Sequence, residues 1–308
     1  MRIDSDISHP WITGLTRAFL IPQASLIEMD LRFQLPNASA QLFLPSVHNV
    51  PNGYKRSAIA IPSCSACFWD HEKKGTIPYW KAEWTLALMT RCPDHFVVLS
   101  EYCRHCSLGL LSVVTDQKHG RLVIRCSICF QAMITCPGDP EKTSPCVKLI
   151  ASLGTTLITA CRNVVPDPMW LGPVDATTFI SVIEDLIWIL TDGNPNGGFS
   201  LLSRGLPPSC CEMSLTRRTL WNRPLNLLSV RHREVVATAV AVALLGNRIT
   251  SEFGITPPQE IVSQPDSYPF SFMLPPIMYG GHGELAKRIK RWPAIIKERA
   301  RLHFKYVS

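Results

Sequence analysis

The sequence has no apolar run long enough to span a bilayer. Its longest apolar stretches, residues 178–190 and 235–245, fall short of the roughly 20 residues that a spanning helix needs, and Glu184 and Asp185 interrupt the first. The opening residues, MRIDSDISHP, also lack the charged and then apolar pattern of a secretory signal. These absences predict a protein that stays in the cytoplasm and does not enter a membrane.

The signatures of common catalytic sites are absent too. The chain contains no G-x-x-x-x-G-K-[ST] phosphate loop, no G-x-S-x-G nucleophile motif and no acidic cluster of the kind that holds two metals for phosphoryl transfer. Cys92 and His95 could form a nucleophilic pair, but their neighbours in the sequence favour a metal site. We therefore expect a binding protein and not an enzyme.

Cysteine, in contrast, is abundant, with 12 residues in a chain of 308. In a cytoplasmic protein this number favours metal binding over disulfides. Eight potential ligands form four pairs, each with two intervening residues: Cys64 and Cys67, Cys92 and His95, Cys103 and Cys106, and Cys126 and Cys129. This spacing lets both members of a pair face one ion, so two pairs supply the four tetrahedral ligands of zinc.

The gaps between the pairs indicate which pairs share an ion. They measure 24, 7 and 19 residues in chain order. The last gap suits one hairpin, so we assign pairs one and two to a first zinc site and pairs three and four to a second. Neither site leaves a position for water, which predicts two structural zinc ions. The other candidates are weaker: His71 and His119 as alternate ligands, His105 pointing away from the metal, Cys136 and Cys146 as a half-site, and Cys161, Cys210 and Cys211 as ordinary thiols.

The hydrophobic pattern predicts a mostly α fold with a small zinc-ribbon or zinc-knuckle β module. We expect three parts: a helical segment over residues 1–60, which could include half of a helix-turn-helix or be an ordinary helical hairpin, a double zinc-binding module over 61–136, and a helical domain over 137–308. Residues 109–114 and 121–125 read as a hairpin that delivers Cys126. The expected helices cover residues 147–161, 175–190 with Asp175 as its cap, 234–245 fully buried, and 284–305 with a break at Pro293.

The net charge of +7 is concentrated in the last third of the chain. Residues 201–308 hold 15 Lys and Arg against 7 Asp and Glu. The expected helix over 284–305 carries Lys287, Lys290, Arg291 and Arg299 opposite an apolar stripe. Such a face could lie on DNA or on a partner, or it could be a solvated surface whose apolar stripe packs on the protein's own core.

Residues 60–130 resemble the TniQ family. The family signature is an upstream C-x-x-C, then Y-W-R-x-x-W, then C-P-x-H, then L-x-x-x-C-x-x-C. This chain has Tyr79-Trp80-Lys81-Ala82-Glu83-Trp84, Cys92-Pro93-Asp94-His95, and Leu99 before Cys103 and Cys106. Residues 11–17 are similar to the family's opening helix. The chain differs in having Lys81 for the arginine, and Phe68, Ser107 and Phe130 where the family often has glycine.

The resemblance implies an accessory protein of bacterial DNA transposition that helps to select the target site. Such a protein would link DNA, or an RNA-guided effector complex bound to DNA, to an AAA+ ATPase regulator and a transposase, and it could form a homodimer. DNA contacts would be mainly to phosphate, from basic residues in 201–233 and 284–305. Tyr79, Trp80 and Trp84 could stack on bases or form a small core against the metal sites.

Two other functions remain open at this point. A zinc-dependent transcription regulator would bind a duplex site through its amino-terminal helices and need no ATPase. A RING-like interaction adaptor would cross-brace its ligands, joining the first pair to the third. The seven residues between the second and third pairs are more than such modules usually have.

Overall fold

The structure, a computed structural model, describes residues 16–44 (except 19, 21, 29 and 40), 62–107, 111–134 (except 117–119 and 127), 143–191, 206, 207, 210, 225–256 (except 247) and 282–297. Within these ranges the fold is mostly helical, with one two-stranded sheet. No helix in the described part of the chain is both long and apolar enough to cross a membrane.

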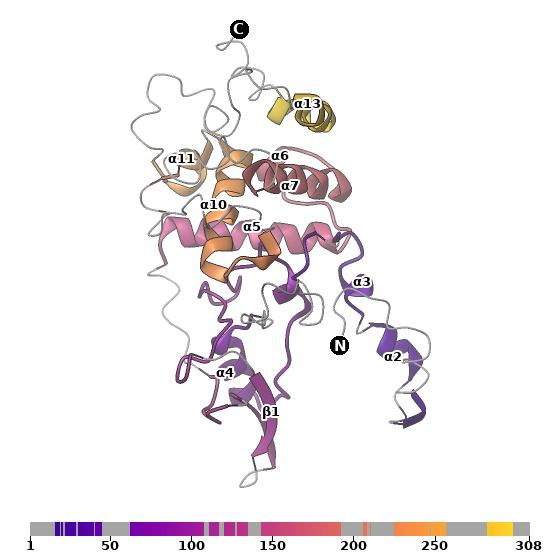
Figure 1. Ribbon diagram of the computed structural model, residues 1–308, viewed down its shortest axis with the longest axis vertical. Coiled ribbons are helices and arrows are strands. Elements are labelled where there is room, and N and C mark those ends of the chain that lie inside the picture. Colours follow the sequence, from indigo (N-terminus) through magenta and orange to yellow (C-terminus); the bar gives the residue numbers. More distant parts are fainter. Residues whose placement is uncertain are drawn as a thin grey trace.

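Three long helices form the centre of the helical layer: α5 (Pro145–Cys161), α7 (Ala176–Thr191) and α10 (Val230–Leu245) (Figure 1). Each begins where its sequence supplies a cap. The side chains of Ser144 and Ser229 accept hydrogen bonds from the first turns of α5 and α10, and Asp175 accepts one from the Thr178 amide at 2.8 Å. The predicted cap of α7 is therefore confirmed.

Helix α10 is buried nearly all round, as its sequence predicts. Every residue from Val235 to Leu245 is buried, and the helix ends at Gly246, whose φ of 55° lies in the left-handed region. The short helices α6 (Pro168–Leu171) and α11 (Arg248–Phe253) pack against it.

Helix α13 (His282–Arg291) lies on the outer side of α7 (Figure 1). As predicted, the helix stops before Pro293, and a short helical turn follows at residues 294–297. Trp292 and Ile296 are buried and Ile289 packs against the core, so the apolar stripe covers the protein's own interior. Lys287, Lys290 and Arg291 are exposed. The side chain of Leu285 and residue Arg299 lie outside the described residues.

The cysteine-rich segment lies below this layer and ends in the hairpin of β1 (Leu111–Asp116) and β2 (Arg121–Cys126) (Figure 1). The strands pair antiparallel with Leu111 opposite Cys126, so the predicted hairpin is confirmed. The segment also contains α4 (Ser65–Lys73) and the 3-10 turn η2 (Ala82–Thr85). The spacing of the ligand pairs did not predict helix α4.

The cysteine-rich segment and the helical layer share one hydrophobic core. A clear contact joins Met89 to Gly154 in the middle of α5, where an added Cβ would lie 3.1 Å from the methionine sulfur. Glycine therefore permits the close approach of this side chain to the helix. The division of the chain into parts at residues 60 and 136 stays a prediction.

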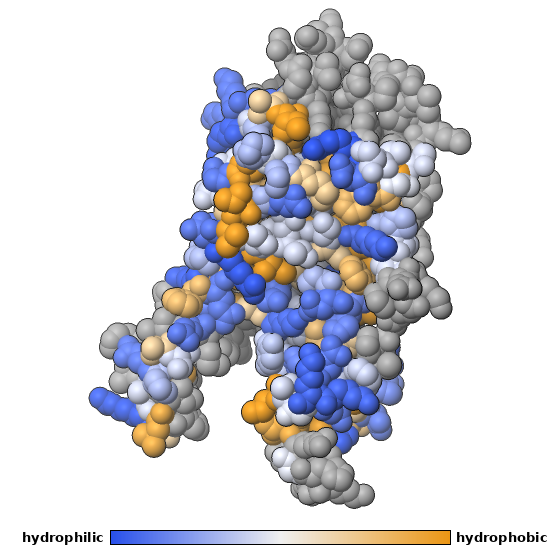
Figure 2. Space-filling model, turned by 180° about the vertical axis from the view of Figure 1, so that it is seen from behind, coloured by the Kyte–Doolittle hydropathy of each residue, from blue (hydrophilic) through white to orange (hydrophobic). Residues whose placement is uncertain are grey.

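The amino-terminal residues form an arm with α2 (Gln23–Glu28) and α3 (Leu31–Gln34), which stands apart from the metal-binding segment (Figures 1 and 2). Asn37 ties its base to the end of α5, since its amide group donates to the Ala160 carbonyl and to Asn163 Oδ1. Residues 16–18 are helical; residues 11–15, the rest of the stretch that resembles the family's opening helix, and most of 254–283 lie outside the described residues.

Candidate metal centres

The eight predicted ligands form two groups in the order that their gaps suggested. Cys64, Cys67, Cys92 and His95 make the first group, and Cys103, Cys106, Cys126 and Cys129 make the second. In each group, one ligand atom from every residue lies within 4.8 Å of the other three. The first pair joins the second and not the third, so the cross-braced arrangement of a RING-like adaptor does not form.

The first pair belongs to a helix start. Cys64 is the N-cap of α4, and its sulfur accepts a hydrogen bond from the Cys67 amide at 3.4 Å. Cys67 lies in the first turn of the helix and is buried, as is Cys64. The positive end of the helix dipole favours thiolates at these two positions.

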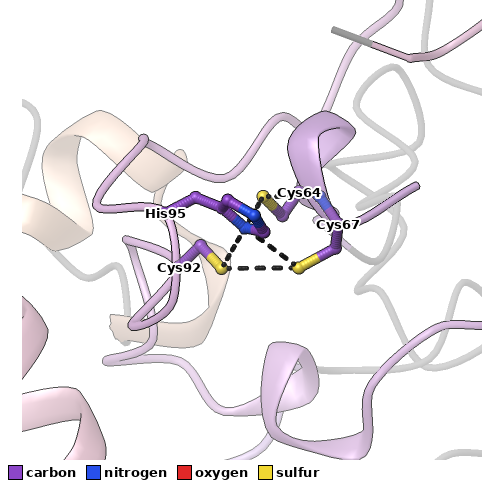
Figure 3. A group of neighbouring side chains, drawn as sticks. All are labelled: Cys64, Cys67, Cys92 and His95. Carbon is purple, nitrogen blue, oxygen red and sulfur yellow. Dashed lines mark hydrogen bonds between the residues drawn. The ribbon is translucent and has the colours of Figure 1, made fainter. Parts of the chain in front are cut away.

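The second pair belongs to a tight knuckle. The Phe96 amide donates to the Cys92 carbonyl at 2.8 Å, and the Cys92 amide donates to the Val97 carbonyl at 2.9 Å. These bonds close the turn and aim Cys92 and His95 at the amino-terminal end of α4 (Figure 3).

The ligand atoms of the first group have the separations of a tetrahedral zinc site. His95 Nδ1 lies 3.6, 3.4 and 3.5 Å from the sulfurs of Cys64, Cys67 and Cys92 (Figure 3). The sulfurs of Cys67 and Cys92 are 3.6 Å apart. Ordinary zinc–sulfur and zinc–nitrogen bonds in a tetrahedron imply edges of about 3.8 Å between sulfurs and about 3.6 Å between sulfur and nitrogen. The donors and their spacing thus fit this ion.

Asp70 orients the histidine ligand, and the sequence prediction missed it. Its carboxylate oxygen Oδ2 lies 3.0 Å from His95 Nε2, the ring nitrogen that faces away from the sulfurs. A proton on Nε2 leaves Nδ1 free to bind a metal, as in other carboxylate–histidine–metal sites. Asp70 follows Cys67 by three residues, so a helix starting at Cys64 would have placed both on one face.

The three thiols of the first group share their protons unequally. Hydrogen bonds from Cys64 and Cys67 lower the pKa of Cys92. The contacts of Cys67 with the sulfurs of Cys64 and Cys92 raise the pKa of Cys67. A metal binds all three as thiolates, so binding must release protons from Cys64 and Cys67. The affinity for metal should therefore fall as the pH falls.

The aromatic run next to the first group is mainly a small core. Phe68 packs edge-to-face between Trp80 and Trp84, with ring centroids 5.3 and 5.6 Å away, and Trp84 is fully buried. Lys81 forms an ion pair with Asp94 in the knuckle of Cys92 and His95. Burial lowers the pKa of Lys81, but Asp94 and the nearby sulfurs outweigh this effect and raise it. Among residues 79–84, only Tyr79 is exposed.

The second group is built from two knuckles, and strand β2 delivers one of them. The amides of Ser107 and Phe130 donate to the carbonyls of Cys103 and Cys126 at 2.7 and 2.9 Å. Cys103 and Cys129 have sulfurs 3.5 Å apart, and the sulfurs of Cys106 and Cys126 are 3.7 Å apart. The spacing again fits tetrahedral zinc. The backbone N–H groups of Cys129 and Ile128 lower the pKa of Cys126 to about 7.

Three residues that follow a knuckle's second ligand lie in the left-handed region. Phe96, Ser107 and Phe130 have φ values of 59°, 58° and 57°. This conformation explains why glycine suits such positions. Phe68, by contrast, lies inside α4 and needs no glycine, because the first pair starts a helix and forms no knuckle.

The other cysteines and histidines that the structure describes do not join either group. Cys146 and Cys210 form a disulfide with their Cα atoms 5.2 Å apart, so the predictions of a half-site at Cys146 and a free thiol at Cys210 are wrong. No local pattern predicts this bond, because the two residues are 64 positions apart. Cys161 is a buried thiol whose pKa burial raises to about 12. His105 and His71 lie outside the groups, and Cys136, Cys211 and His119 lie outside the described residues.

Charged contacts fix the metal-binding segment to the start of α10. Glu101, between the two groups, accepts hydrogen bonds from the Val230 amide at 2.9 Å and from Arg233 at 2.7 Å. Arg91, next to Cys92, pairs with Glu234 at 2.6 Å. The sequence offered no clue to these pairs, which join residues more than 125 positions apart.

Comparisons with known proteins do not add a relative to this picture. No protein-family model matches the chain, and no curated protein matches it significantly. The family resemblance therefore stays a prediction from the sequence motifs over residues 60–130.

Proposed function

We propose that both groups bind zinc and that the protein is a DNA-transposition accessory protein of the TniQ kind. Zinc suits the two donor sets, because three cysteines with one histidine, and four cysteines, are common structural zinc ligands with tetrahedral geometry. The observed ligand separations support this ion over the larger oxygen-bound cations.

One observation carries the family proposal. The residues of the Y-W-K-x-x-W and C-P-D-H motifs form a single physical unit around the first group. Trp80 and Trp84 pack edge-to-face on Phe68 of α4, the helix that carries Cys67. Lys81 forms an ion pair with Asp94 inside the C-P-D-H knuckle. Because the motif residues contact one another, they have a structural reason to occur together. Four short patterns that matched by chance would not be expected to make such contacts.

The architecture supports recruitment as the role. The metal ions would have no open coordination position, so they would stiffen loops that lack a core of their own. The shared core and the pairs Glu101–Arg233 and Arg91–Glu234 make these loops one body with the helical layer. Such a rigid body could hold target DNA, or an RNA-guided complex on DNA, in a fixed position relative to an AAA+ ATPase regulator and a transposase.

The test is a reconstitution with purified partners. We expect the zinc-loaded protein to pull down an AAA+ transposition regulator in the presence of target DNA and ATP, and to lose this binding when zinc is removed by chelation. Binding to one specific duplex without any ATPase would instead favour the transcription-regulator alternative. No binding to either, with two zinc ions present and the fold intact, would overturn the transposition role while leaving the zinc assignment in place.

A further inference from the structure

Tyr79 forms a stacked pair with His71 at the carboxyl-terminal end of α4. Their ring centroids are 4.5 Å apart, and the ring planes differ by 17°. Tyr79 is nevertheless 54% exposed. Because the imidazole stacks on one face of the phenol ring, a ligand that stacks on Tyr79 would use the opposite face.

The chain on both sides of Tyr79 holds the ring in place. After α4 the chain reverses through Gly75, with a φ of 67°, and Thr76 donates its amide and its hydroxyl to the His71 carbonyl. On the other side Trp80 packs on Phe68. Burial and the charge of Lys81 lower the pKa of His71, so a neutral imidazole supports the ring at neutral pH. An exposed aromatic ring held in this way loses little entropy when it stacks on a ligand.

Two exposed lysines follow His71 in the chain. Lys74 is exposed and close enough for its charge to act on His71. Lys73 is also exposed, and its ammonium lies 5.0 Å from the centroid of the Trp69 ring. A flat exposed ring beside an exposed cation is an arrangement with which proteins hold unpaired bases and their phosphates.

We infer that Tyr79, supported by His71, is a stacking platform for an unpaired base of single-stranded nucleic acid, with Lys74 attracting an adjoining phosphate. A duplex keeps its bases stacked on one another, so it cannot offer a free base face to Tyr79. Ile77 is also exposed beside Tyr79, so a peptide partner is the competing ligand that the test below must separate from a base. The inference does not rest on the transposition role, and it concerns a different ligand from the duplex target.

The test compares binding of the zinc-loaded protein to fluorescent oligo-dT and oligo-U of about 15 nucleotides, a length that covers a typical single-strand site. The variants are Tyr79→Ala, Tyr79→Phe, and Phe130→Ala as a matched loss of an exposed aromatic ring at the second group. A duplex formed from two fully complementary strands serves as the third probe. Zinc content and thermal unfolding show whether each variant keeps its fold.

We expect Tyr79→Ala to weaken single-strand binding by at least about fivefold, while Tyr79→Phe and Phe130→Ala stay within about twofold of the parent. Lys74→Ala should lower the salt dependence of the same binding. A preference for one of the two single strands would identify DNA or RNA as the ligand.

Several results would overturn the inference: parent-like binding by Tyr79→Ala, an equal loss in Phe130→Ala, or no binding of either single strand by the parent. If the duplex alone binds, the single-strand platform fails and the duplex-binding part of the proposed function stands. If Tyr79→Ala instead abolishes capture of a protein partner and leaves all three probes unaffected, the ring belongs to a protein interface.

Discussion

Arg233 in the first turn of α10 donates a hydrogen bond of 2.7 Å to Glu101, which lies in the chain between the two metal groups. The arginine side chain is fully buried and also donates to the carbonyls of Leu228 and Ala87. The glutamate uses its second oxygen to accept from the Val230 amide. Every polar atom that this pair buries in the contact has a partner, so the pair fixes one orientation of the metal-binding segment on the helical layer.

Glu101→Gln is expected to lower the free energy of unfolding by about 3–5 kcal/mol, because it leaves the Arg233 charge buried without a counter-charge. Denaturant unfolding of the zinc-loaded protein measures this loss. Glu234→Gln is the matched control: its pair with Arg91 is less buried, with each side chain 17% exposed, so the loss should be smaller than in Glu101→Gln. Equal losses of unfolding free energy in the two variants would show that the buried Glu101–Arg233 pair contributes no more to stability than the Arg91–Glu234 pair.

The two metal sites should load independently of each other. Cys92→Ser and Cys126→Ser each remove a ligand from one group only. Elemental analysis is expected to find about two zinc ions per parent chain and about one in each variant, because a site with three remaining ligands binds zinc far more weakly. Less than one zinc ion in a folded parent would refute the metal assignment for this chain.

Asp70→Asn is expected to weaken zinc binding at the first group by about 10–100-fold, since the carboxylate fixes the ring orientation of His95 and makes it a better donor. Competition with a chromophoric chelator measures the affinity of each site. The second group is the internal control and should keep its affinity. An unchanged zinc affinity at the first group would show that the contact of Asp70 with His95 does not contribute to metal binding.

How far the sequence could predict this structure depends on the range of each interaction. The ligand pairs, the caps at Asp175 and Gly246, and the break at Pro293 are set by residues close together in the chain, and local chemistry predicts them. The Cys146–Cys210 disulfide, the Glu101–Arg233 ion pair and a hydrogen bond from the Trp292 indole to Asp185 join distant segments, so no local pattern reveals them. Asp70 is an intermediate case, because it could be predicted only once Cys64 was known to start a helix.

Asp185 shows how such a distant contact decides the place of a helix. It is the buried acid in the apolar face of α7, and it accepts hydrogen bonds from Arg288 at 2.7 Å and from the Trp292 indole at 3.0 Å. Arg288 also lies over the ring of Trp188 on α7, 4.4 Å from its centroid. Asp185→Ala should therefore release α13, because the Arg288 and Trp292 donors lose their shared acceptor.

Hydrogen exchange of residues 282–297 measures this release, and we expect faster exchange there with little change in α5 and α10. Asp185→Asn is the informative companion, since the amide oxygen can still accept from Trp292 but no longer balances the charge of Arg288; it should give an intermediate rate. Unchanged exchange in both variants would show that burial of Trp292 and Ile296 holds α13 in place without Asp185.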